Sequence, residues 1–271
     1  MNNEIVITGS RQSSGISKRT GVFLAAVSLL TVGSVANAAT YKGIAVHIGK
    51  GTARVVVRTD AANKPSSVSV LMTSGVLKGL PTGHNKKTAE GNWVYPLPMP
   101  KHGPNTGFTH VVIDWDPHGH PPAHIYTVPH FDIHFYGIAP AIVEKISFDG
   151  PTDPAIKVSD AGLLPPDYKV LPETAVNQMG VHAVDTTSPE FHGKPFTATF
   201  IYGYYKGTLI FVEPMVAAAY LETKPHFTAP LKKPAHYSYS GYYPTEYSVR
   251  YDSSSKAYVL ALEGLQYAGA K

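Results

Sequence analysis

The chain has 271 residues, a formal net charge of +4 at neutral pH and no cysteine. Because cysteine is absent, a disulfide and a thiolate metal site are both excluded, and any metal would need His, Asp, Glu or backbone oxygen ligands. The basic residues form no stripe of the kind that nucleic-acid-binding proteins carry, which excludes nucleic acid as a partner.

Residues 1–38 have the pattern of an export signal. A Lys-Arg pair precedes the apolar run VFLAAVSLLTVGSV, and the small residues of Ala36-Asn37-Ala38 provide a cleavage site. The alternative is an N-terminal membrane anchor, but the apolar run of 14 residues is shorter than the ~20 that span a bilayer. We therefore expect a periplasmic or extracellular protein that has no membrane segment after cleavage.

Period-two alternation predicts strands along the rest of the chain. The predicted strands and hairpins cover residues 43–49, 52–60, 66–74, 91–100, 108–116, 130–138, 196–215 and 245–267. Prolines within 91–100 favour an edge position for that strand. Short helical segments are expected in 75–83, 139–149 and 215–223, and residues 150–179 are expected to form a long loop.

These elements predict a mainly β fold, a single antiparallel sandwich or barrel-like domain with short helical insertions. The expected organisation is a signal peptide at 1–38 and a β domain at 39–222. A Tyr- and Pro-rich extension at 223–271 follows, with a final hairpin packed on the same domain.

The segment VPHFDIHFYG, residues 128–137, is the strongest sign of chemistry. Alternating side chains of a strand point to opposite faces, so His130, Asp132 and His134 share one face and the residues between them face the core. Two imidazoles on one face could bind a divalent metal if other strands complete the site. Asp132 could ligate the metal or orient a ring. The alternative is a hydrogen-bonded polar cluster.

Two later segments offer further ligands. NQMGVHAVD contains His182 and Asp185, and the apolar strand TLIFVEPM contains Glu213, a carboxylate that would be costly to bury without a cationic partner. We predict a mononuclear site with His130, His134, His182 and Glu213 as metal ligands. Zn, Fe, Mn and Ni all suit this set, and an open position could hold water or substrate.

The other polar candidates are given roles around the metal or in the fold. Asp132 is assigned as a base or as a group that orients a ring, and His120, in the loop HGHPPAH, as a cap on the mouth of the site. Asp114 and Asp116 are interpreted as structural. No GxSxG, HExxH or P-loop motif occurs, which excludes the corresponding catalytic classes.

Three segments carry a resemblance: IDWDPHGHPPAHIYTVPHFDIHFYGI, NQMGVHAVD and GTLIFVEPM. There the chain resembles exported bacterial proteins of an uncharacterised domain family, one member of which is controlled by an extracytoplasmic-function sigma factor. The resemblance runs from about Tyr41 to Tyr220. It implies one common grouping of site residues but no particular reaction, and the grouped residues are His120, His130, Asp132, His134, His182 and Glu213.

The function predicted from these observations is metal-assisted hydrolysis or cupin-like chemistry on a small molecule. Two alternatives stay open. One is an envelope protein that binds a ligand or a metal without turnover, and the other is a structural protein that forms homo-oligomers.

Overall fold

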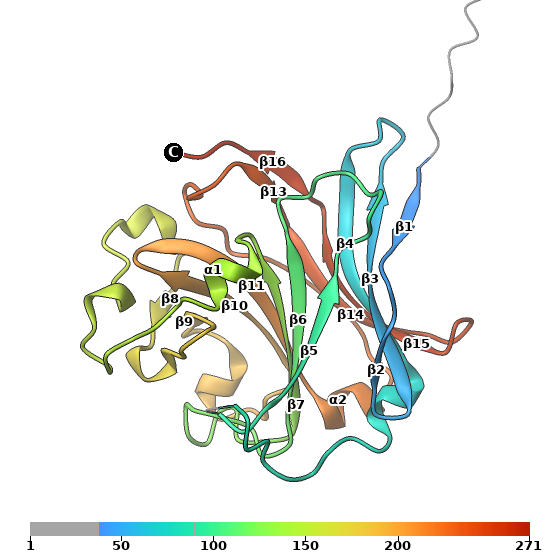
Figure 1. Ribbon diagram of the computed structural model, residues 1–271, viewed down its shortest axis with the longest axis horizontal. Coiled ribbons are helices and arrows are strands. Elements are labelled where there is room, and N and C mark those ends of the chain that lie inside the picture. Colours follow the sequence, from blue (N-terminus) through green and yellow to red (C-terminus); the bar gives the residue numbers. More distant parts are fainter. Residues whose placement is uncertain (1–37, 89) are drawn as a thin grey trace, which may run out of the picture. The chain divides into compact units, whose positions relative to one another are not determined.

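Two antiparallel β-sheets, called sheet A and sheet B below, pack face to face in the computed structural model, which describes residues 38–88 and 90–271 (Figure 1). These residues lie in one compact unit. The predicted signal peptide lies outside the described residues except for its last position, so it stays a prediction.

Sheet A has the strand order β1-β3-β4-β15-β14-β12, with β2 paired to β3. Its strands are β1 (Thr40–Lys42), β2 (Val46–Ile48), β3 (Gly51–Thr59), β4 (Pro65–Thr73), β12 (His226–Pro230), β14 (Glu246–Asp252) and β15 (Ala257–Glu263). The last hairpin of the chain, β14 and β15, lies inside this sheet because β15 pairs with β4. The C-terminal 49 residues that the sequence sets apart therefore contribute to the same sheet as the N-terminal strands.

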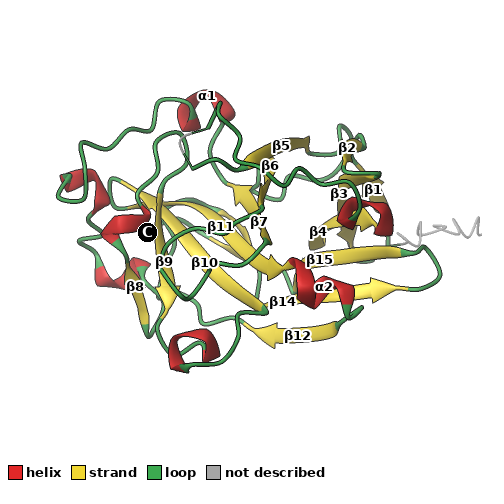
Figure 2. Cartoon of the chain, turned by 90° about the horizontal axis from the view of Figure 1, so that it is seen from below, coloured by secondary structure: helices red, strands yellow, loops and turns green. Residues whose placement is uncertain are grey.

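Sheet B has the strand order β5-β6-β7-β11-β10-β9-β8. Its strands are β5 (Trp93–Pro98), β6 (His110–Asp116), β7 (His130–Tyr136), β8 (Tyr168–Val170), β9 (Val181–Asp185), β10 (Ala198–Tyr205) and β11 (Thr208–Ala217). Figure 2 shows β7, β11, β10 and β9 running side by side, with helical turns and loops around them. As expected from its prolines, β5 lies at an edge.

The remaining elements are short. A two-stranded ribbon joins β13 (Gly241–Tyr243) to β16 (Gln266–Ala268). The α-helices are α1 (Pro140–Val143) and α2 (Ala218–Glu222), and 3-10 turns cover Ser74–Leu77, Pro154–Ile156, Ala161–Leu163, Pro172–Thr174 and Pro189–His192. Among the described residues, no helix has the length and apolar character needed to cross a membrane.

The main core fills the space between the sheets. Phe131, Ile133 and Phe135 of β7 are fully buried there, and side chains of β3, β4 and β15 from sheet A belong to the same apolar cluster. Burying one such side chain stabilises the fold by about 1.5–3 kcal/mol. This alternation leaves the other side chains of β7 on the outer face of sheet B, away from sheet A, where the loops between strands cover them.

The mainly β architecture agrees with the sequence prediction, and the predicted hairpins at 43–60, 196–215 and 245–267 are present. The predicted helix at 139–149 is limited to the four residues of α1. The long loop predicted at 150–179 contains the strand β8, and the short strands β9, β12, β13 and β16 were not predicted.

Candidate metal centre

The outer face of sheet B carries a belt of buried ionisable side chains, which is unusual for a sheet surface. His130, Asp132 and His134 alternate on β7 with the core residues, and all three are at most 4% exposed. The register of β6 with β7 places Asp116 opposite His130 and Asp114 opposite Asp132, on the same face. Neighbouring strands thus place carboxylates beside imidazoles.

The strands on the other side of β7 extend this belt. The register of β11 with β7 pairs Val212 with Phe135 and Met215 with Asp132, so Glu213 lies beside His134. Further along the sheet, β9 contributes His182, which is paired with Gly203 of β10. Segments far apart in the sequence therefore meet on one face because of the strand order.

One cluster on this face, called the His134 group below, consists of His134, His182 and Glu213. Nε2 of His134 lies 3.6 Å from Oε1 of Glu213, and Nε2 of His182 lies 3.5 Å from Oε2. One ligand atom from each residue lies within 4.8 Å of the others, which is close enough to hold a metal ion. Nδ1 of His182 donates a hydrogen bond to the Thr174 carbonyl at 2.8 Å, which leaves Nε2 free for a metal.

Asp114 of β6 contacts the His134 group at the Nδ1 side of the His134 ring. Its Oδ2 lies 3.4 Å from Nδ1 of His134, on the ring edge away from Glu213. No hydrogen bond joins the two side chains, but a carboxylate on this side of the ring would favour the tautomer that leaves Nε2 as the ligand atom. Asp114 was interpreted as structural from the sequence, and its position gives it a direct contact with the site.

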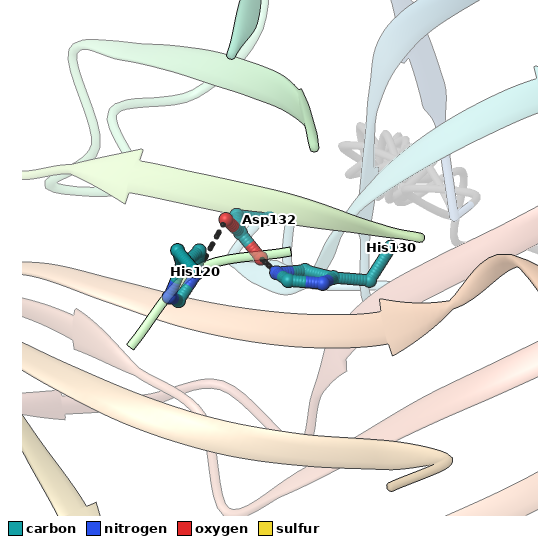
Figure 3. Close-up of side chains that lie close together, drawn as sticks. All are labelled: His120, His130 and Asp132. Carbon is teal, nitrogen blue, oxygen red and sulfur yellow. Dashed lines mark hydrogen bonds and ion pairs between the residues drawn. The ribbon is translucent and has the colours of Figure 1, made fainter. Parts of the chain in front are cut away.

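The second cluster, called the His120 group below, consists of His120, His130 and Asp132 (Figure 3). Nε2 of His120 lies 3.2 Å from Oδ2 of Asp132, and Nε2 of His130 lies 3.1 Å from Oδ1. Nδ1 of each ring is held by a backbone carbonyl, that of Pro121 for His120 and that of Val128 for His130, both at 2.7 Å. The carboxylate thus lies between two imidazoles whose Nε2 atoms face it.

The structure therefore distributes the predicted site residues over two groups. His134, His182 and Glu213 come together, whereas His130 joins the predicted catalytic residues His120 and Asp132. The separation has a simple cause, because residues four apart on an extended strand lie about 13 Å apart. Two imidazoles at that spacing cannot readily reach one ion.

Burial controls the protonation of the His134 group. It raises the pKa of Glu213 well above its usual value, and the charge of Asp132 adds to this effect. Burial also lowers the pKa of His134 to about 3 and that of His182 to about 4. At neutral pH, and without a cation beside them, the two rings are neutral, and burial favours the protonated form of Glu213.

The His120 group has the opposite balance. Burial by itself would lower the pKa of His120, but the charge and hydrogen bond of Asp132 outweigh it and raise that pKa to about 10. Burial by itself would raise the pKa of Asp132, but the imidazoles of His130 and His120 hold it well below its usual value. On β6, burial and the nearby charge of Asp132 raise the pKa of Asp116 to about 10 and also raise that of Asp114. Among the carboxyl groups of this face, Asp132 is thus the one that most readily carries a negative charge.

Both groups border a single small cavity of about 60 Å³. Asp132 and His120 line it from one group and His182 from the other, and Glu90 and Glu173 also contribute to its wall. Of the four histidines in the two groups, His120 and His182 have the most exposed side chains, at 20% and 12%. These two rings connect the buried face with the cavity.

The remaining candidates are placed elsewhere or were missed. Asp185, considered beside His182, pairs with Lys232 at 2.8 Å. Asp114, Asp116 and Glu90 were not selected as site residues. Asp114 and Asp116 join the site through the register of β6 with β7, which the sequence does not show. The sequence signal that could have found them is the alternation in IDWD, which places both aspartates on one face of the predicted strand at 108–116.

Comparison with known proteins gives one match. The model of a family described as "TTHB210-like: Hypothetical protein TTHB210" matches residues 60–115, a stretch that begins directly after β3 and ends one residue before the end of β6. This part of the chain is therefore similar to an uncharacterised family, and of the residues discussed above it includes Glu90 and Asp114. No curated protein and no solved structure matches the chain.

Proposed function

We propose that the chain is an exported protein that binds a divalent transition metal through His134, His182 and Glu213 and acts on a small molecule in the adjoining cavity. The observation that carries this proposal is the distribution of unsatisfied polar atoms. Among the described residues, eight buried side-chain nitrogen or oxygen atoms have no hydrogen-bond partner, and seven of them lie on this face of sheet B. They include both ring nitrogens of His134 and Oε2 of Glu213.

Unsatisfied buried atoms are costly. Each one destabilises a fold by about 1–3 kcal/mol, and native proteins contain few of them. A bound cation would satisfy the Nε2 atoms and the carboxylate oxygens together, because all of them present lone pairs to a common point. The cluster therefore supports a metal site better than it supports a purely structural hydrogen-bond network.

The ligand chemistry favours a site with open positions. Two imidazoles and one carboxylate are the protein ligands of zinc hydrolases and of non-haem iron sites, which leave coordination positions for water or substrate. A metal in such a site can lower the pKa of bound water toward ~7. The neighbouring cavity of about 60 Å³ has room for water or for the reacting end of a small substrate, and Asp132 lies in its wall.

Metal analysis tests this proposal. The mature chain, purified without a His tag, is expected to contain a transition metal, and Glu213→Gln and His182→Ala are expected to lose the metal of this group. His226→Ala, an exposed histidine of β12, serves as the matched control and should retain it. If the two site variants bind metal as tightly as the unaltered protein does, the proposed centre is wrong.

A second measurement separates catalysis from storage. Co²⁺ gives visible absorption bands that depend on coordination number, so the cobalt-loaded protein is titrated with azide. A change in the bands would show an open coordination position, as metal-assisted hydrolysis requires. Unchanged bands would favour the alternative that the protein holds metal without turnover.

Export and location are part of the proposal because only the sequence supports them. The basic pair, the apolar run and the small residues before Ala39 support cleavage and release into the periplasm or the medium. Mass spectrometry of the protein recovered from the cell envelope and the medium would locate the N-terminus. An uncleaved chain in the cytoplasm would contradict this part.

A further inference from the structure

The His120 group is separate from the ligands assigned above, and we propose that His120, His130 and Asp132 form a second site for a divalent transition metal. This inference stands on its own residues and does not depend on metal binding at the His134 group. It assigns metal binding to His120, which the sequence indicated as a cap, and to Asp132, which the sequence assigned as a base or as a group that orients a ring.

The distances within this group match those between ligands of one ion. Metal–nitrogen bonds of about 2.0–2.1 Å in tetrahedral geometry place neighbouring ligands about 3.3 Å apart. Nε2 of His120 lies 3.2 Å from Oδ2 of Asp132 and Nε2 of His130 lies 3.1 Å from Oδ1, and one ligand atom from each residue lies within 4.8 Å of the others. Figure 3 shows the carboxylate between the two rings, with one oxygen toward each.

The ring orientations also favour a metal. Both Nδ1 atoms are used by backbone carbonyls, so in the neutral rings each Nε2 carries a lone pair and cannot donate to Asp132. This is the arrangement in which metal-bound histidines are held by their surroundings. With both rings neutral, the two Nε2 atoms and the Asp132 carboxylate are all hydrogen-bond acceptors, so a cation or an additional proton is needed between them.

Protonation of His120 alone does not resolve the conflict. An imidazolium there satisfies Oδ2 of Asp132, but His130 Nε2 and Asp132 Oδ1 remain without hydrogen-bond partners although they lie 3.1 Å apart. His130 is fully buried, so water does not reach it freely. Oδ2 of Asp116, which is paired with His130 across the strands, is also without a partner and provides a further oxygen nearby.

The number of bound metal ions tests the inference. The full mature chain is loaded with Zn²⁺ and measured by native mass spectrometry and elemental analysis, and two ions per chain are expected. Asp132→Asn and His120→Ala should each reduce the number to one. His118→Ala, an exposed histidine of the same loop, is the matched control and should keep two.

The outcomes separate the two proposals. If Asp132→Asn loses one ion while Glu213→Gln loses the other, both sites are supported. If Glu213→Gln binds as many ions as the unaltered protein but Asp132→Asn and His120→Ala lose one, the second site stands and the function proposed above fails. If His120→Ala and Asp132→Asn bind as many ions as the unaltered protein, the second site is wrong.

The test remains decisive even if one of the variants does not fold. His120 is the most exposed member of the group, so His120→Ala is the variant least disruptive to packing. The unaltered protein gives an independent result, because a plateau at one ion per chain, together with no loss in the folded His120→Ala variant, overturns the second site.

Discussion

Gly203 of β10 lies directly beneath the ring of Phe211. A Cβ atom added to this glycine would overlap the Phe211 ring, because it would meet three of the ring's carbon atoms far inside van der Waals contact. Phe211 in turn packs against His134 and His182, with ring centroids 4.9 and 5.3 Å apart. The absence of a side chain at position 203 thus allows the aromatic ring to support two imidazoles of the His134 group.

Gly203→Ala is therefore expected to weaken both the fold and the metal site. Overpacking of a well-packed core costs about 1–3 kcal/mol, and a displaced Phe211 would shift His134 and His182 away from Glu213. Chemical denaturation measures the free energy of unfolding, and isothermal titration with Zn²⁺ measures affinity. Gly83→Ala is the control, because a Cβ there would meet no atom within 4 Å. Unchanged affinity in Gly203→Ala would contradict the supporting role of Phe211.

Ile133→Ala is expected to destabilise the fold while leaving metal binding intact. Ile133 is fully buried on the inner face of β7, where truncation of a large aliphatic side chain costs about 2–5 kcal/mol. The ligands point to the opposite face, so the number of bound ions should not change while the chain is folded. Val94→Ala, at a 42% exposed position of β5, should change the unfolding free energy by no more than about 0.5 kcal/mol.

Metal binding at the His134 group should release a proton near neutral pH. Burial raises the pKa of Glu213 and so favours its protonated form, whose proton a bound metal would displace, whereas His134 and His182, with pKa values of about 3 and 4, are already neutral. Affinity should therefore rise with pH. Calorimetric titrations with Zn²⁺ in buffers of different ionisation enthalpy would reveal the released proton.

Two results bear on that assignment. Glu213→Gln, which has no carboxyl proton to lose, should remove the Glu213 share of the released protons along with the binding itself. If the apparent binding enthalpy of the unaltered protein is the same in every buffer at pH 7, Glu213 does not carry the displaced proton.

The tip of the β14–β15 hairpin should contribute stability that is lost only in strong acid. Hydrogen bonds from Ser254 and Ser255 lower the pKa of Asp252 to about 2, below the ~3.9 of an unfolded chain. The stabilising contribution is complete above the unfolded pKa and disappears as the pH falls through about 2. NMR titration of the Asp252 carboxyl measures this pKa.

The two serines provide the matched test of that hairpin. The double variant Ser254→Ala with Ser255→Ala should move the pKa of Asp252 upward toward its ordinary value. A carboxyl that already titrates near the ordinary value in the unaltered protein would show that these hydrogen bonds do not persist in solution.

The sequence predicts one face of the site well. Alternation from His130 to Phe135 separates core residues from polar residues, and the structure has the same division. β7 can be recognised from its alternation and β11 from its apolar run, because both signals are local. The short strands β12, β13 and β16 could not be, because strands of three to five residues depend on pairing more than on local propensity.

The grouping of ligands could be predicted only in part. Alternation indicates which side chains share a face, but the partners across the sheet depend on strand order and register. His182 and Glu213 were recognised as site residues from their own segments. The contact of Asp114 with His134 was missed because it depends on the register between two strands. His130 and His134 belong to different groups because the rise per residue of a strand places them too far apart to share one ion.

The His134 group combines segments that meet only after sheet B has assembled, since β7, β9 and β11 each contribute one residue. An unfolded chain therefore offers scattered imidazoles and carboxylates with no preference among ions. If the proposed metal binding at this group is correct, the metal would be selected during folding from the ions that the surrounding compartment supplies. The compartment in which the chain folds would then determine which metal it binds as much as its ligand residues do.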